Sequence, residues 1–174
     1  MTTTVARPTR RLTPPTRKWL LLLHVITSLG WLGLNVGNLT LTVTGLTTDD
    51  PTTQHIALGA TYLVGGPLLV PVSLLAYTSG ILLGFYSRWG VFRYRWVLVK
   101  FVLTTIAVLL IPLSLLPGLE DVSALVSAAP ANQLVDIGQH GASMLSAGIV
   151  STTMYVTCAV LSVHKPWGRT RRAG

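Results

Sequence analysis

Residues 17–50 read RKWLLLLHVITSLGWLGLNVGNLTLTVTGLTTDD, a basic pair followed by a long apolar stretch that ends in an acidic pair. The apolar part runs from about Trp19 to Val43, which exceeds the ~20 residues that cross a ~30 Å hydrocarbon core as a helix. It is longer than the apolar region of a secretory signal, and no Ala-x-Ala-like cleavage site follows it. The stretch is therefore interpreted as a retained transmembrane helix.

The charges of the whole chain repeat this pattern. Twelve of the thirteen Lys and Arg residues lie in three segments, and all five acidic residues lie in the two segments between them. The basic segments are the N-terminus (Arg7, Arg10, Arg11, Arg17, Lys18), a central loop (Arg88, Arg93, Arg95) and the C-terminus (Lys165, Arg169, Arg171, Arg172), and the acids are Asp49, Asp50, Glu120, Asp121 and Asp136. Because cationic loops stay on the cytoplasmic side, both termini and the central loop are predicted to lie inside.

Four apolar segments separate these charged regions, so the sequence predicts an all-α integral membrane protein, an up-down-up-down four-helix bundle. The expected spans are about 19–44, 55–86, 94–115 and 137–163, within a transmembrane domain of residues 18–165. Residues 1–17 are expected to form a disordered basic cytoplasmic tail, and 166–174 a second basic tail. The second span should kink or break at Gly65-Gly66, Pro67 and Pro71, and 119–127 should form a short interfacial helix.

Composition excludes several classes of function. Half of the residues are hydrophobic and only 10% are charged, as in a membrane protein. The net charge of +8 flanks apolar segments and lacks a basic stripe with interleaved aromatics, so anionic lipid headgroups are the expected partner and nucleic acid is not. A phosphate loop, a nucleophile elbow and a His-Glu-x-x-His motif are absent, so hydrolysis and phosphoryl transfer are poorly supported.

The first predicted helix has two distinct faces. Its polar face, within an arc of about 80° at helical spacing, consists of His24, Ser28, Trp31, Asn35, Asn38 and Thr42. The opposite side carries Gly30, Gly33 and Gly37, a small-residue pattern that predicts close packing against a neighbouring helix. For the two asparagines and the hydroxyls, hydrogen bonds to other helices are the favoured interpretation.

His24 and Lys100 are the two ionisable residues placed well inside predicted spans. His24 lies five residues past Trp19, and Lys100 lies four residues past Trp96 on a helix that enters from the same side. Both are therefore at nearly the same depth, on diagonal helices whose separation could hold a planar cofactor or a solvated ion. The alternative for Lys100 is snorkelling to cytoplasmic headgroups, which its flexible stem allows at this depth. No carboxylate lies in any predicted span to pair with it.

The outer half offers soft metal ligands. His55 and His140 begin the second and fourth predicted helices, where solvated histidines are the favoured interpretation. His140, Met144, Met154 and Cys158 share one narrow arc, and these ligand types suit copper. Since they extend over ~27 Å of helix, a copper path would need ligands from other helices, and packing is the alternative role.

Two stretches resemble a known family. Leu22-Leu23-His24 followed by Trp31-Leu32-Gly33 is similar to the first helix of the copper-resistance CopD domain. Ser79-Gly80-Ile81-Leu82-Leu83, Trp89-Gly90 and Trp96-Val97-Leu98-Val99-Lys100 resemble the Gly-rich helix end, the turn and the Lys-bearing helix of that family. The superfamily includes HemJ-type protoporphyrinogen oxidases, in which a His on an early helix and a Lys on a later one are associated with haem.

The leading hypothesis is therefore a multi-pass protein of a bacterial-type inner membrane that holds b-type haem, or less readily copper, as a redox or binding protein. The candidate cofactor-binding residues are His24, Trp31, Lys100 and His140, and the candidate metal ligands are His24, His140 and Met144. One alternative is a cofactor-free transport or accessory subunit that docks other membrane proteins or itself, and another is a HemJ-like oxidase. The residues do not decide whether the chain is an enzyme.

Overall fold

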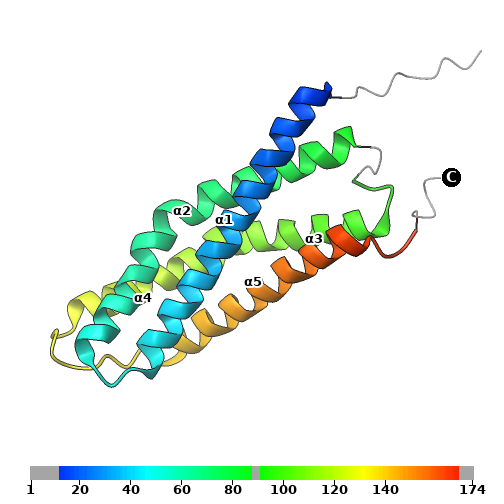
Figure 1. Ribbon diagram of the computed structural model, residues 1–174. Helices are drawn as coiled ribbons and strands as arrows, with labels where there is room; N and C mark the ends of the chain where they lie inside the picture. The colour runs from blue at the N-terminus through cyan, green and yellow to red at the C-terminus, as the bar shows by residue number, and fades with distance from the viewer. Residues whose placement is uncertain (1–11, 88–90, 169–174) are drawn as a thin grey trace, which may run out of the picture.

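The chain forms a bundle of long helices in a computed structural model that describes residues 12–87 and 91–168. The segments in chain order are α1 (Pro14–Thr47), α2 (Pro51–Tyr86), α3 (Arg95–Leu110), the π-helical turn η1 (Ile111–Leu115), α4 (Leu116–Ala128) and α5 (Gly138–His164) (Figure 1). Because α3, η1 and α4 follow one another without a gap, they make one helical unit, Arg95–Ala128. Within the described residues, four helices are long and apolar enough to cross a membrane, which confirms an all-α, four-helix membrane fold.

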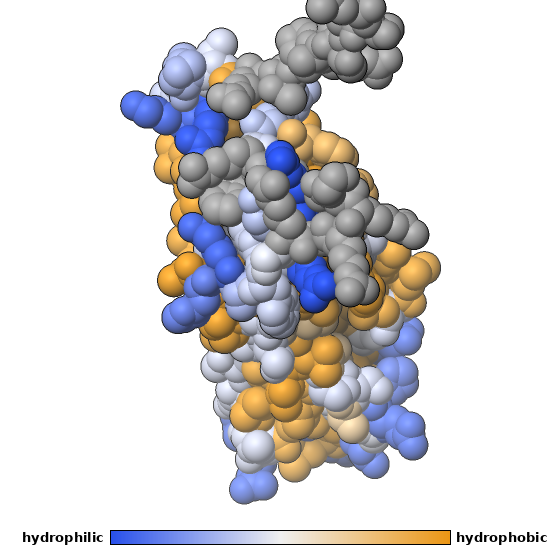
Figure 2. All heavy atoms as spheres, turned by 90° about the vertical axis from the view of Figure 1, so that its right-hand side faces the viewer, coloured by the Kyte–Doolittle hydropathy of each residue, from blue (hydrophilic) through white to orange (hydrophobic). Residues whose placement is uncertain are grey.

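The bundle has two chemically different ends. At one end of the bundle α1 and α3 begin and α2 and α5 end; we call it the basic end. We call the opposite end, where the loop Thr48–Asp50 joins α1 to α2, the acidic end. In the face shown in Figure 2, hydrophobic residues cover much of the middle and hydrophilic residues lie mainly toward the top and bottom. Many large apolar side chains are exposed along the helices, among them Leu29, Leu63 and Leu113, as expected where lipid is the solvent.

The helices are longer than a hydrocarbon core requires, and the contacts indicate where the excess lies. Both Asn38 of α1 and Leu119 of α4 lie against Gly65 of α2, so Glu120 and Asp121, which are exposed, lie near the level of Asn38. From Trp19 to Asn38 the α1 axis rises ~28 Å at ~1.5 Å per residue, close to a ~30 Å core. An apolar layer of ~30 Å that begins at Trp19 would therefore end near Asn38 and leave residues 39–50 beyond it.

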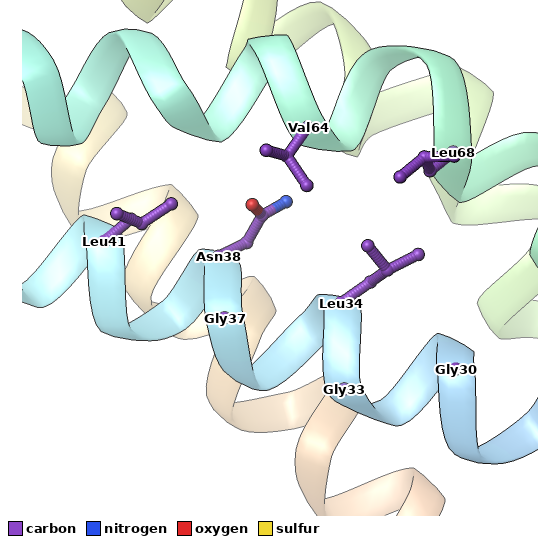
Figure 3. Close-up of a pocket in the computed structure, with 8 residues that line it drawn as sticks. All are labelled: Gly30, Gly33, Leu34, Gly37, Asn38, Leu41, Val64 and Leu68. Atoms are coloured by element: carbon purple, nitrogen blue, oxygen red, sulfur yellow. The ribbon is translucent and has the colours of Figure 1, made fainter.

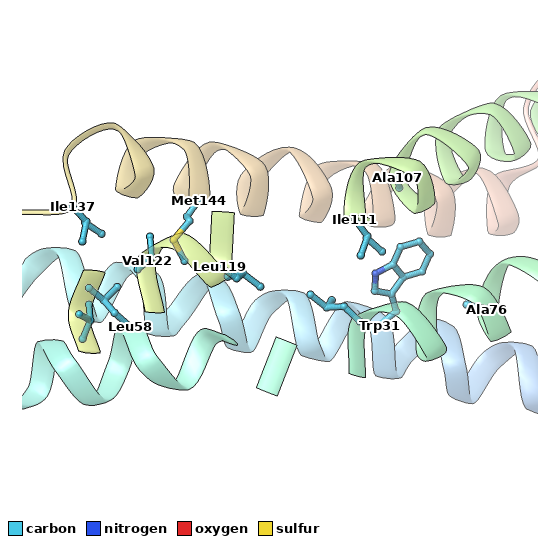
Figure 4. Close-up of a cluster of buried hydrophobic side chains, with 11 residues drawn as sticks. Trp31, Leu58, Ala76, Ala107, Ile111, Leu119, Val122, Ile137 and Met144 are labelled. Atoms are coloured by element: carbon cyan, nitrogen blue, oxygen red, sulfur yellow. The ribbon is translucent and has the colours of Figure 1, made fainter. Parts of the chain in front are cut away.

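The core lies between α2, α4 and α5 toward the acidic end and around Trp31 nearer the middle (Figure 4). Leu58, Val122 and Leu119 are almost completely buried. Close helix approach depends on glycines whose Cβ position a neighbour already fills, such as Gly45 against Leu58 and Gly148 against Leu39. These contacts tie α1 to α2 and to α5, and leave α1 and α3 on the diagonal.

Several predicted helix boundaries differ from the observed ones. α1 begins at Pro14, inside the predicted tail 1–17, because Pro14 and Pro15 are compatible with the first helical turn; residues 1–11 and 169–174 of the predicted tails lie outside the described part of the chain. α2 begins at Pro51 and not near 55, with the Asp50 side chain accepting a hydrogen bond from the Thr53 amide. α5 agrees with its predicted span to within one residue at each end.

The prolines do not break the helices. α2 continues through Pro67 and Pro71, and its axis bends, as Figure 1 shows, so the kink was predicted correctly and the break was not. The third span does not end near 115, and 119–127 is not a separate interfacial helix. The π-helical turn that contains Pro112 widens the backbone spiral where the proline lacks an N–H, and the helix continues to Ala128.

The expected packing of the glycine face is wrong within the chain. A Cβ atom added to Gly33 or Gly37 would meet nothing within 4 Å, and one added to Gly30 would touch only Val72, at 3.8 Å. These glycines instead line an open groove of about 400 Å³ along α1 and α2, together with Leu34, Asn38, Leu41, Val64 and Leu68 (Figure 3). The reason is that α2 and α5 pack on other parts of the α1 surface, through Gly45, Leu39 and Leu46.

Candidate functional site: a polar cluster near the basic end

His24 is held against α2. Its Nδ1 atom lies 3.0 Å from the carbonyl oxygen of Ala76 and 3.1 Å from the hydroxyl oxygen of Ser79. A carbonyl can only accept, so Nδ1 carries the proton and donates it, and in the neutral form of the ring Nε2 keeps its lone pair. Nε2 has no hydrogen-bond partner among the described residues.

Gly80 makes this contact possible. A Cβ atom at Gly80 would lie 2.9 Å from Cε1 of His24, closer than such atoms pack. The Ser79 hydroxyl donates to the carbonyl of Leu75 at 2.6 Å, which leaves its oxygen free to accept from the histidine. The sequence Ser79-Gly80 therefore supplies both the acceptor and the space for the ring.

Lys100 reaches the opposite pair of helices. Its Nζ donates a short hydrogen bond to the hydroxyl of Ser162 on α5, and this hydroxyl donates in turn to the carbonyl of Cys158 at 2.8 Å. His24 with Ser79 on α1 and α2, and Lys100 with Ser162 on α3 and α5, lie toward the same end of the bundle, and no described hydrogen bond joins the two pairs. We call His24, Ser79, Lys100, Cys158 and Ser162 the basic-end cluster; it draws on all four spans.

The cluster has no acidic member. All five acids of the chain lie in the loop between α1 and α2, in α4, or in the loop before α5. The equal depth of His24 and Lys100 stays a prediction; His24 is bonded to α2 and Lys100 to α5. The ring does not simply face α3 across the diagonal.

Trp31 lies two turns further along α1 and is part of the core. Its side chain is 4% exposed, and its ring packs edge-on against Tyr155 of α5 with centroids 4.8 Å apart. It belongs to the same buried cluster as Ile111 and Ala107 (Figure 4). Trp31 thus bounds the basic-end cluster toward the middle of the membrane.

The predicted metal ligands do not come together. Asn35 of α1 bonds to Thr152 of α5; His24 lies eleven residues from Asn35 toward the basic end, and His140 lies twelve residues from Thr152 toward the acidic end. At ~1.5 Å per residue the two histidines are ~34 Å apart along the bundle. Met144 is buried in the core, and no group of three or more His, Cys, Asp or Glu residues within 12–87 and 91–168 is arranged to hold a metal ion.

The two outer histidines have different surroundings. His55 bonds through Nε2 to the carbonyl of Gln133 at 3.1 Å, whereas His140 is exposed in the first turn of α5. His55 therefore anchors the loop before α5. His140 shares no described contact with the basic-end cluster.

The polar face of α1 is partly satisfied across helices, as expected. The Asn35 amide donates to the carbonyl of Gly148 at 3.2 Å and to the hydroxyl of Thr152 at 2.8 Å. Thr42 bonds within its own helix, to the carbonyl of Asn38. The buried Oδ1 of Asn38 has no partner among the described residues.

Two members of the cluster were not identified as site residues from the sequence. Ser79 was noted only as part of the stretch that resembles the CopD family. A serine beside a glycine can supply both an acceptor and space for a histidine on a neighbouring helix, so this pair could have indicated the contact with His24. Ser162 carried no signal, because nothing in the sequence indicates which hydroxyl of α5 lies at the depth of Lys100. No protein-family model matches the chain, and neither a curated protein nor a solved structure is significantly similar to it.

Proposed function

We propose that this membrane protein binds an acidic, metal-containing cofactor at the basic-end cluster, and that b-type haem is the candidate. The observation that carries the proposal is the state of His24. Histidines that ligate metals usually donate one ring N–H to a backbone carbonyl or another acceptor, which fixes the tautomer and presents the other nitrogen. His24 has this arrangement, with Ala76 and Ser79 as acceptors and Nε2 without a described partner.

The charge of the cluster fits the same ligand. Haem carries two propionates, and Lys100 is a cation whose neighbourhood contains no carboxylate of the chain. His24 would hold the iron through Nε2, and Lys100 would bind a propionate. Bound haem would supply one-electron chemistry, while the protein would supply the ligand, the counter-charge and an apolar surrounding.

Copper has weaker support. His24 and His140, two of its three predicted ligands, lie at opposite ends of the bundle, and Met144 packs in the core. A copper site would need donors other than this set.

The test is the absorption spectrum of the wild-type protein, purified in lipid nanodiscs from haem-replete cells, with metal analysis. The proposal predicts a haem Soret band and stoichiometric iron. A colourless protein without bound metal would contradict it.

A second candidate, a cofactor-free accessory subunit, is favoured by one observation. The groove of Gly30, Gly33 and Gly37 is open on the surface of α1 and α2, and small residues of this kind let another transmembrane helix approach closely. Co-purification of a colourless chain with another membrane protein, lost on replacing Gly33 by Leu, would support this function over cofactor binding.

A further inference from the structure

The side chain of Lys100 could either extend to the lipid headgroups or bond to a group inside the bundle. It lies five residues after the start of α3 at Arg95, ~7 Å along the helix. A flexible lysine at that depth ordinarily extends its stem along the helix and puts its ammonium among the headgroups. The Nζ atom of Lys100 has a partner within the protein, the half-buried Ser162 of α5, two residues before that helix ends at His164.

Ser162 supplies the hydrogen-bond acceptor for the Lys100 ammonium. Its hydroxyl accepts from Nζ, and its own proton is used on the Cys158 carbonyl at 2.8 Å, so its oxygen is presented as an acceptor. No other described side chain bonds the ammonium. Cys158 and Ser162 are one helical turn apart, and α5 thus offers a directed acceptor within reach of the Lys100 ammonium.

The remaining two N–H groups of the ammonium have no partner among the described residues. A cation inside a membrane is costly unless an opposite charge or several acceptors compensate it. The residues in 12–87 and 91–168 supply neither, since the acids of the chain lie in other segments and Ser162 is neutral. The missing compensation is one acidic group with two oxygens.

We propose that Ser162 is a positioning residue that holds Lys100 inside the bundle, and that the pair is a binding point for an acidic group, a carboxylate or a phosphate, at the same end of the bundle as His24. This inference deepens the proposed function and rests on it for the identity of a cofactor propionate. The same chemistry would recognise the phosphate of an anionic lipid. The orientation of Lys100 itself does not depend on either ligand.

The first experiment measures how accessible Lys100 is. The protein in nanodiscs is treated with a membrane-impermeant amine-acetylating reagent, and modification is quantified by mass spectrometry, with the exposed Lys18 and Lys165 as internal references. Ser162→Ala should expose Lys100 and speed its acetylation about tenfold, the effect of losing a hydrogen bond to a charged group. Ser162→Thr, which keeps the hydroxyl, should restore the wild-type rate.

A matched control is Ser146→Ala. This serine is also on α5, but its hydroxyl bonds only to the carbonyl of Ser143 in its own helix, so its loss should leave Lys100 unchanged. Equal acetylation of Lys100 in the wild type and Ser162→Ala would overturn the positioning role, whatever the colour of the protein. A difference in a colourless protein would keep it and remove the haem.

The second experiment identifies the acidic group. Acetylation of Lys100 is compared in nanodiscs of phosphatidylcholine alone, with added haem, and with phosphatidylglycerol. Protection by haem without anionic lipid assigns the carboxylate, and protection only by phosphatidylglycerol assigns the lipid phosphate. Protection by neither overturns the acidic-group site.

Discussion

Two glycines of α1 should respond in opposite ways to the same substitution. Gly45 packs against α2, where an added Cβ atom would lie 2.6 Å from both Cγ and Cδ2 of Leu58. Gly33 faces the open groove, and its added Cβ would meet nothing within 4 Å. We therefore expect Gly45→Ala to destabilise the bundle and Gly33→Ala to be neutral or stabilising.

The magnitudes follow from the surroundings. Leu58 is completely buried, and Cγ is not a free end that can swing away, so overpacking should cost ~1–3 kcal/mol. Alanine in place of glycine in a helix interior contributes up to ~1 kcal/mol in the other direction. The contribution is smaller at Gly45 than at Gly33, because Gly45 lies two residues from the end of α1. The two variants should differ in free energy of unfolding by about 2 kcal/mol.

The assay is reversible unfolding of each variant in mixed detergent micelles, followed by circular dichroism as the denaturing detergent is raised. Wild-type stability in Gly45→Ala would refute the close α1–α2 contact. A loss in Gly33→Ala as large as that in Gly45→Ala would show that a second copy or another protein covers the groove.

Three further predictions concern the loops and the orientation. A cysteine introduced at position 48 of an otherwise Cys-free chain should react with an impermeant thiol reagent from outside the cell, whereas a single cysteine added at either terminus of separate Cys-free chains should not; the reverse labelling would contradict the orientation derived from the charges. Gln54→Ala should lower the free energy of unfolding by ~1–3 kcal/mol and speed hydrogen exchange at the Val135 amide, since the Gln54 amide donates to the Val135 carbonyl and accepts from its N–H. Hydrogen bonds from the hydroxyl and then the backbone N–H of Thr53 hold the pKa of Asp50 below its ordinary value of 3.8. The stability that this carboxylate contributes should therefore be complete above pH 3.8 and be lost as the pH falls through the lower folded pKa, so the stability difference between wild type and Asp50→Asn should shrink only in strong acid.

The four spans and their order could be predicted from the lengths of the apolar segments and the alternation of charge between them. Apolar length and charge alternation are properties of single segments, so the spans were predicted, and α5 was placed to within one residue at each end. Helix ends depend on finer terms. Pro14 permits an earlier start of α1, and the π-helical turn at Pro112 permits the third span to continue. Neither effect can be predicted from hydropathy.

The hydrogen-bond partners at the candidate site were not predictable from the sequence. Helical rise predicts from the sequence alone that His24 and Lys100 lie at one level. It does not say which neighbour lies on each face, because that depends on where glycines such as Gly45 and Gly148 admit another helix. The expectation that Gly33 and Gly37 would be packed failed for the same reason, and Ser162 could be found only in three dimensions.

The central proposal is that His24 binds a haem iron. It is tested most directly by the absorption spectrum of His24→Ala compared with those of the wild type and His55→Ala, each purified from haem-replete cells. If Nε2 of His24 holds the iron, the haem bands should be lost or strongly shifted in His24→Ala. They should be unchanged in His55→Ala, whose ring bonds to the Gln133 carbonyl at the acidic end. A coloured protein whose spectrum is indifferent to His24→Ala would contradict the account and place the cofactor elsewhere in the bundle.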